Sequence, residues 1–279
     1  MILLLKQAVI LIGSFIAAVT DYKTGYIYDK ITYPMIAIGV LLNLIELGKE
    51  LSIDKFIELF SVGIIIFVFG YGMYWLGKIG GGDVKLFTGI GLLLPFESGI
   101  FPLNIFVLNT LIWAGISSLV FYGVYYLIKY ARKGIDWKEN IEGIKKAGGL
   151  AILILFYFYF IYSIGMQEII LVLLIPLSIA LVFMALEKGI KKEFFLKKIS
   201  LKEMEEDELI AVEFEKKEVL KELNLGLKGV LGEKEKKELE KKGIKELFVY
   251  RNLPKFGPFI FVGVLINTAF PELMINLFI

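Results

Sequence analysis

Residues 80–87 have the sequence Gly-Gly-Gly-Asp-Val-Lys-Leu-Phe and stand where one long apolar stretch ends and the next begins. Because a charge beside hydrocarbon is costly, the acid Asp83 at this membrane edge is a functional hypothesis by default. The three glycines before it permit close approach of another backbone. A second acid, Asp21, ends the first apolar stretch in the same way. We therefore expect the fold to bring Asp21 and Asp83 together.

Hydrophobic residues make up 57% of the 279-residue chain, and the mean hydropathy is +0.72. Runs of about 18 or more apolar residues recur along it, which is typical of a polytopic α-helical membrane protein. Residues 1–20 are expected to be a permanent span rather than a secretory signal. Lys6 lies inside this run, and no small-x-small cleavage site precedes Asp21.

The sequence predicts about eight transmembrane helices. The fourth, 84–95, would reach only about 18–20 Å against a hydrocarbon core of about 30 Å. If it crosses, the basic loops, including 129–146, share one face, which the positive-inside rule makes cytoplasmic, and both termini lie outside. The other spans are expected at 2–20, 31–47, 56–76 and 103–128, after 148–149, after 167–168, and at 258–279.

A soluble insert is expected between the last two spans. Residues 187–255 hold 18 of the 31 Lys and Arg and 16 of the 29 acids. Residues 208–214 and 246–250 are predicted strands, and 232–242 a charged helix that Gly243 would end. A small α/β cytoplasmic module is therefore expected, with a disordered linker as the alternative. The expected domains are a membrane bundle carrying both aspartates, this insert and a final transmembrane helix, at 1–186, 187–255 and 256–279.

The chain contains no Cys and no His. Disulfides, thiolate nucleophiles, Ser-His dyads and His zinc motifs are therefore excluded, and acid–base chemistry must come from carboxylates, Lys or Tyr. No metal and no cofactor are expected. A nucleic-acid partner is not expected either, because the chain lacks a clustered excess of basic residues.

Two carboxylates at one depth of the membrane are suited to peptide hydrolysis. If Asp21 and Asp83 are neighbours, like-charge repulsion makes them share one proton. The ionised acid can take a proton from water while the protonated acid polarises the scissile carbonyl. Which of them is the base stays open, because such a pair titrates jointly. The glycines would let a substrate strand lie against the loop.

Other interpretations remain open at this point. An Asp at a helix end is often only an N-cap or a solvated terminus, and Asp29 is predicted to be the N-cap of the second span. A transporter that binds cations or protons at Asp21 and Asp83 is the main alternative. A phosphate loop at 77–82 is rejected, because it follows an apolar helix and lacks the Gly-Lys-Ser/Thr ending.

Several motifs resemble those of a known family. Gly80-x-Gly82-Asp83, with Lys85 after it, resembles the Gly-x-Gly-Asp motif of type IV prepilin and preflagellin peptidases, which are membrane-embedded aspartic proteases. Asp21-x-Lys23, followed by Gly25 and Ile27, is similar to the family's first aspartate motif. Residues 253–258 resemble the C-terminal region of archaeal members. Tyr28-Asp29 departs from the Pro-Asn often found in the family.

The resemblance implies an aspartic endopeptidase that removes the short basic leader of type IV pilin-like or archaellin precursors. It would act in the cytoplasmic membrane with its site facing the cytoplasm, and without methyltransferase activity because no Cys-containing domain precedes the first span. Prepilin and preflagellin substrates both stay open. The implied catalytic residues are Asp21 and Asp83, and the implied substrate-binding or loop positions are Gly80, Gly81, Gly82, Lys23 and Lys85.

Overall fold

The computed structural model describes residues 1–96, 105–165, 167–204, 208–215, 230–231, 233–241, 244–271 and 273. Six helices in these ranges are long and apolar enough to cross a membrane, which confirms a polytopic helical protein. Two more helices, α4 (Gly81–Leu93) and α10 (Gly257–Ala269), have 13 residues each. The six long helices are α1 (Ile2–Thr24), α2 (Asp29–Leu47), α3 (Ile53–Trp75), α5 (Phe106–Lys133), α6 (Trp137–Ser163) and α7 (Gln167–Phe194).

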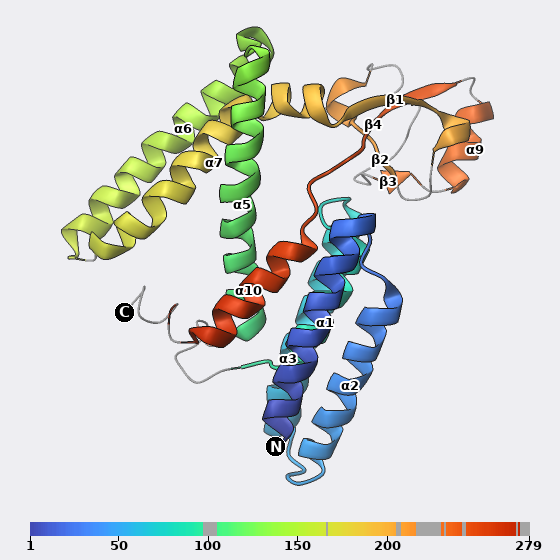
Figure 1. Ribbon diagram of the computed structural model, residues 1–279, viewed down its shortest axis with the longest axis vertical. Helices are drawn as coiled ribbons and strands as arrows, with labels where there is room; N and C mark the ends of the chain where they lie inside the picture. Colours follow the sequence, from blue (N-terminus) through green and yellow to red (C-terminus); the bar gives the residue numbers. More distant parts are fainter. Residues whose placement is uncertain are drawn as a thin grey trace.

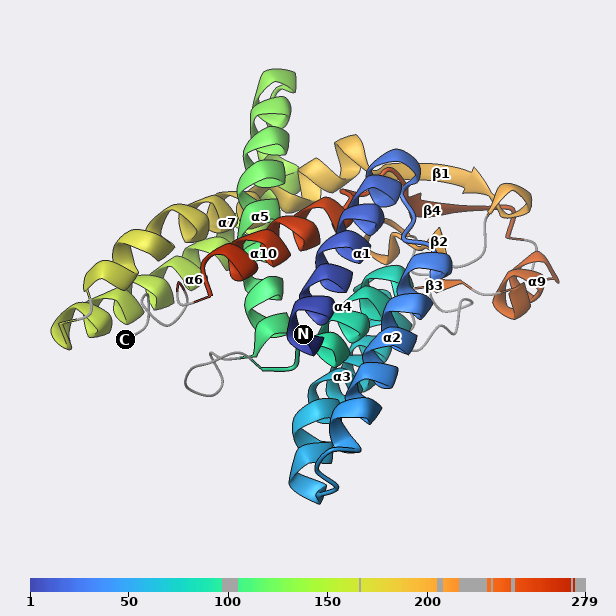
Figure 2. The ribbon, with the colours of Figure 1, turned by 60° about the horizontal axis from the view of Figure 1, so that its bottom comes forward.

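The short helix α4 lies inside the N-terminal bundle, where it packs against α1, α2 and α3 (Figure 2). Its residues from Leu86 to Leu93 are all buried, so it is covered by protein around its whole circumference. A helix that is apolar on every side is typical of such a buried position. The bundle thereby encloses α4 from Leu86 onward, and Asp83 lies in its less buried first turn.

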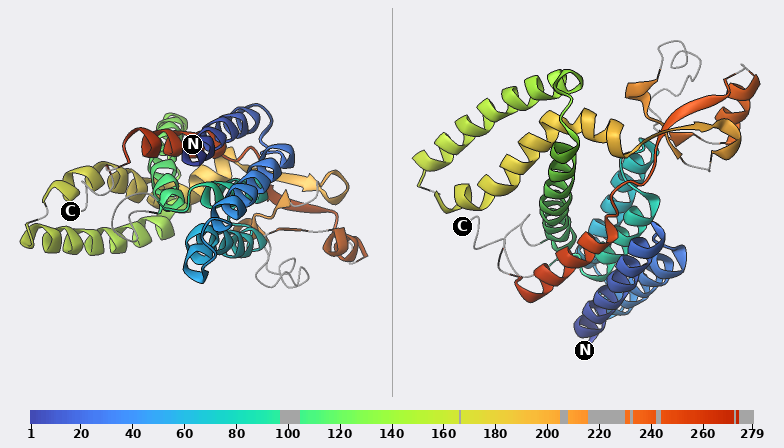
Figure 3. Two further views of the ribbon diagram at one scale, coloured as in Figure 1. Left: turned by 90° about the horizontal axis from the view of Figure 1, so that it is seen from below. Right: turned by 45° about the horizontal axis from the view of Figure 1, so that its top comes forward.

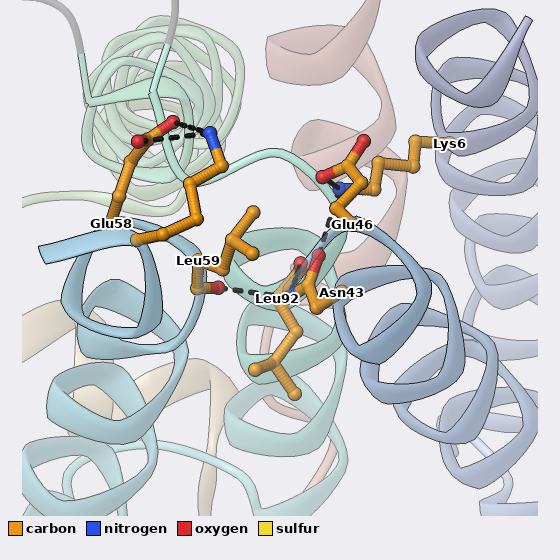
Figure 4. A network of polar contacts seen from close by, with 7 residues as sticks. Lys6, Asn43, Glu46, Glu58, Leu59 and Leu92 are labelled. Carbon is orange, nitrogen blue, oxygen red and sulfur yellow. Dashed lines mark hydrogen bonds and ion pairs between the residues drawn. The ribbon is translucent and has the colours of Figure 1, made fainter. Parts of the chain in front are cut away.

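The C-terminal end of α4 is held by a buried polar network (Figure 4). The Asn43 amide donates to the backbone carbonyls of Leu59 in α3 and Leu92 in α4, each at 2.8 Å. Lys6 from α1, which is only 4% exposed, donates to Asn43 Oδ1 at 2.8 Å and pairs with Glu46 at 2.7 Å. The last carbonyls of a helix have no partner within it, so Asn43 satisfies one that α4 leaves open.

The second half of the chain joins this bundle through α10. This helix packs against both α1 and α5, and Figure 1 shows it passing between them. Helices α6 and α7 lie side by side and extend away from the α1–α4 group (Figure 3). The first and last parts of the chain therefore meet at the α1–α10 contact.

The insert forms two small antiparallel sheets around its own core. Strand β1 (Leu196–Ser200) pairs with β4 (Glu246–Tyr250), and β2 (Glu208–Leu209) pairs with β3 (Val230–Leu231). Helix α9 (Glu233–Lys241) contributes Leu239 to this core. The predicted 246–250 strand and the charged helix are thus confirmed, whereas Gly243 lies outside the described residues. The strand predicted at 208–214 is wrong beyond Ile210, which still forms an antiparallel bridge with Val249, since a 3-10 turn follows at Val212–Phe214.

Several predicted boundaries differ from the structure. Helix α1 continues through Asp21 to Thr24, so Asp21 lies within the helix and not after it. The expected basic loop at 129–146 is almost entirely helical, because α5 ends at Lys133 and α6 begins at Trp137. The proposed start of the insert at 187 falls within α7, which continues to Phe194.

Candidate active site

Asp21 is the most buried acid at the site, with 6% of its surface exposed. Its Oδ2 accepts a hydrogen bond of 2.7 Å from the backbone N–H of Gly257, the first residue of α10. The first N–H groups of a helix have no partner within it, and they favour a negative group. The contact therefore caps α10 and holds the carboxylate of Asp21 in one orientation.

Asp83 occupies the third position of α4, for which Gly80 is the N-cap residue. Its carboxylate accepts a hydrogen bond from the Gly80 backbone N–H. This is the reach-back half of a capping box, in which an acidic side chain in the first turn satisfies the N-cap amide. Asp83 thus has a structural contact of its own, and a catalytic role would come in addition to it.

The two aspartates are neighbours in space although 62 residues separate them in the sequence. Helices α1 and α4 are in contact, and the carboxyl groups are close enough for Asp21 to act electrostatically on Asp83. The structure therefore places the two acids on adjacent helices, and their action as a proton-sharing pair stays a prediction. Two such groups can share one proton when they are not both ionised.

The glycines before Asp83 differ in what they face. A Cβ on Gly82 would lie 2.8 Å from Ile27 Cβ and 2.9 Å from Ile27 O, so the α1–α2 connection occupies that space. A Cβ on Gly81 would meet the ring of Tyr74 at 3.3 Å. Gly80 is exposed and would meet only the Asp83 carboxylate. Gly82 is therefore needed for packing, and Gly80 is the position of the three that is open to a ligand.

The two lysines singled out from the sequence have different surroundings. Lys85 donates to Asp29 Oδ1 at 2.5 Å, and its ammonium lies 4.9 Å from the centre of the Tyr33 ring. Asp29 is thus an ion-pair partner between α2 and α4, and its predicted role as N-cap is wrong, because Tyr28 is the N-cap residue. Lys23 lies exposed in the last turn of α1.

Sequence reasoning missed three residues that complete the site from the far end of the chain. The Lys255 ammonium donates to the Tyr22 carbonyl at 2.5 Å, and its charge acts on Asp21. The Tyr122 hydroxyl of α5 donates to Lys255 O and accepts from Lys255 N, both at 3.2 Å. Together with Gly257, these residues fix the segment before α10 against α1. The motif at 253–258 was a signal for Lys255 and Gly257, and the sequence offered no signal for Tyr122.

In the described part of the chain, no three acidic side chains are grouped so that they could hold a metal ion. The expectation of a metal-free site stays a prediction. The chemistry available here comes from the two carboxylates and from the hydroxyls, amides and lysines around them.

The protein is a polytopic helical membrane protein. It has a candidate acid–base site, because the adjacent helices α1 and α4 carry Asp21 and Asp83. Residues 8–120, which include both aspartates, match the model of the type IV leader peptidase family. The resemblance based on the two aspartate motifs is confirmed over this segment.

Named proteins of archaea are also similar to this chain. Prepilin peptidase EppA of Methanothermobacter thermautotrophicus is 38% identical over 96 residues, which are 34% of this chain and 24% of that protein. Preflagellin peptidase of Methanococcus maripaludis is 27% identical over 147 residues, 52% of this chain and 64% of that protein. Prepilin peptidase EppA of Methanocaldococcus jannaschii is 32% identical over 167 residues, 59% of this chain and 44% of that protein.

The match with each of these relatives spans less than two thirds of that relative's own length. No solved structure matches the chain significantly.

Proposed function

We propose that this chain is a membrane aspartic endopeptidase that removes the short basic leader of type IV pilin-like precursors, either prepilins or preflagellins. The observation that carries the proposal is the approach of Asp21 and Asp83, each from a motif within the segment that matches the family. The names of the similar archaeal proteins support the same substrate class.

In the proposed reaction, one carboxylate is ionised and the other is protonated. The ionised group takes a proton from water, and the water oxygen attacks the scissile carbonyl carbon. The protonated group donates a hydrogen bond to the carbonyl oxygen, where negative charge develops. The proton taken from water then passes to the leaving amine as the C–N bond breaks. No metal ion is required.

The proposal includes a topology with eight spans, in which α4 and α10 also cross. Both aspartates would then lie at the cytoplasmic end of the bundle, where the leader of a membrane-anchored precursor is found. A precursor helix could reach the site by lateral diffusion in the membrane. Water would not have to cross hydrocarbon, because the cut lies at the membrane edge.

The first test replaces each acid by its neutral isostere. Asp21→Asn and Asp83→Asn should each lower leader removal from a pilin-like precursor by about 10²- to 10⁴-fold, because general acid–base catalysis is lost. Cleavage is measured in membranes as the shortening of the precursor on a gel, with enzyme accumulation checked in the same samples.

Asp54→Asn is the matched control, because Asp54 is an exposed acid in the first turn of α3 and should leave cleavage unchanged. Normal processing by either site variant would remove that aspartate from the mechanism. Reconstituted protein that moves ions across vesicles and never shortens a precursor would favour the transporter alternative.

A further inference from the structure

The C-terminal end of α5 extends beyond the membrane core. Its 28 residues span about 42 Å at 1.5 Å per residue, against about 30 Å of hydrocarbon. About 20 residues cross the hydrocarbon, starting from the apolar first turns of α5. About eight of its 28 residues then remain for the membrane–water interface. These are the last two turns, which carry Lys129, Arg132 and Lys133. This end of α5 therefore lies at the depth of lipid headgroups.

A surface hollow of about 400 Å³ lies at this end of α5. It is lined by three cationic and two apolar or aromatic side chains: Tyr125, Ile128, Lys129, Arg132 and Lys133. Basic residues in the last turn of a helix also stabilise its dipole. That effect explains the charge of this helix end, but it does not explain why the hollow also has an apolar wall.

An exposed apolar stripe continues from the hollow toward the membrane core. Phe121, Val124, Tyr125 and Ile128 are 60%, 39%, 49% and 49% exposed. Their spacing of three and four residues places them on one face of the helix. The face thus changes from apolar to cationic along α5, which is the order of acyl chain and headgroup in a lipid.

The cations of the hollow are partly fixed before any ligand binds. The Lys129 ammonium lies 4.9 Å from the centre of the Phe194 ring and 5.4 Å from that of Tyr125. Lys133 pairs with Glu193 at 2.5 Å. One acid among three cations leaves a net charge of about +2 beside the hollow, which favours an anionic group.

We propose that this face of α5 binds one anionic phospholipid, with the phosphate at Lys129 and Arg132 and an acyl chain along the stripe. Basic pockets at the membrane surface are suited to such headgroups. The stripe favours a lipid over a free phosphate ion, because contacts of the lipid's own acyl chain with the stripe add to the ion pair of its phosphate. This site is separate from the aspartate pair and does not depend on the proposed peptidase activity.

The test uses the purified full-length protein in detergent, titrated with phosphatidylglycerol or phosphatidylcholine and followed by native mass spectrometry. Each cation contributes about fivefold to the binding of an anionic lipid. Phosphatidylglycerol should therefore bind roughly 25-fold more tightly than phosphatidylcholine. The double substitution Lys129→Gln with Arg132→Gln should abolish this preference, and excess inorganic phosphate should not displace the bound lipid.

The matched control is Lys145→Gln with Lys146→Gln, which removes two exposed cations from α6. It should retain the preference, because neither lysine lines the hollow. Equal affinity of the unchanged protein for both lipids would overturn the proposal. An equal loss in the control pair would also overturn it, because binding would then follow total charge. Displacement of the lipid by phosphate would overturn it as well, because the site would then be one for small anions.

Discussion

At the scale of single residues, the orientation of Asp21 depends on the absence of a side chain at position 257. A Cβ on Gly257 would lie 2.9 Å from both Cβ and Oδ2 of Asp21. Real Cβ atoms essentially never come so close, so either α10 or the carboxylate would have to move. The 2.7 Å hydrogen bond from Gly257 N–H would be weakened in both cases.

Gly257→Ala should therefore lower leader cleavage by about 10- to 100-fold, since a displacement of about 1 Å at a reacting group has effects of this size. Cleavage rate and yield of folded protein are measured together. Gly72→Ala is the control, because a Cβ there meets nothing within 4 Å. If Gly257→Ala cleaves as fast as the control, the contact does not position Asp21.

The sequence predicted the two acids because each is marked locally, by an apolar run that stops at a carboxylate. It could not predict the partners of those acids. Gly257, which donates to Asp21, is 236 residues away from it, and Lys255, whose charge acts on Asp21, is 234 residues away. Such contacts follow from how the helices pack, and neither composition nor spacing records that packing.

At the scale of elements, α4 is short and its position depends on its two ends. Asp83 caps the first turn, and Asn43 accepts and donates hydrogen bonds that tie the other end to α1 and α3. A change in this network would therefore shift α4, a rigid helix of 13 residues, and displace Asp83 with it.

Asn43→Leu should lower the free energy of unfolding by about 2–4 kcal/mol, because two carbonyls and the Lys6 ammonium lose a buried partner. Denaturant unfolding in detergent micelles measures this change. Ser118→Ala is the control, since the Ser118 hydroxyl donates to the Gly115 carbonyl of its own helix. A change below that of the control would show that water replaces the Asn43 amide.

The boundaries of the elements were harder to predict than their existence. Apolar runs locate the part of a helix in hydrocarbon, so α6 was expected to begin after Gly149. It begins at Trp137, and the Asp136 side chain accepts a bond of 3.2 Å from Glu139 N. That local Asp-x-x-Glu pattern is a capping signal that was available in the sequence.

Strand β1 was missed because its five residues contain two lysines and no regular alternation.

At the scale of the whole molecule, the eight-span topology can be tested directly because the chain has no Cys. Lys49 and Phe96 line one hollow of about 390 Å³. The single substitutions Lys49→Cys and Phe96→Cys should each react with a membrane-impermeant thiol reagent applied outside intact cells. Cysteines at Lys23 and Lys78 should react only after the membrane is opened. Labelling is measured by the mass added to the protein. Reaction of Lys23→Cys and Lys78→Cys from opposite faces would contradict a shared site for Asp21 and Asp83.

The hydrogen bond between Asp21 and Gly257 also has a consequence for biosynthesis. The ribosome delivers Asp21 and Asp83 to the membrane early, yet Gly257, whose amide orients Asp21, is made 174 residues after Asp83. During translation, a nascent chain would carry both acids without their final geometry. Under the proposed function, the two acids would therefore lack their working arrangement until α10 docks against α1.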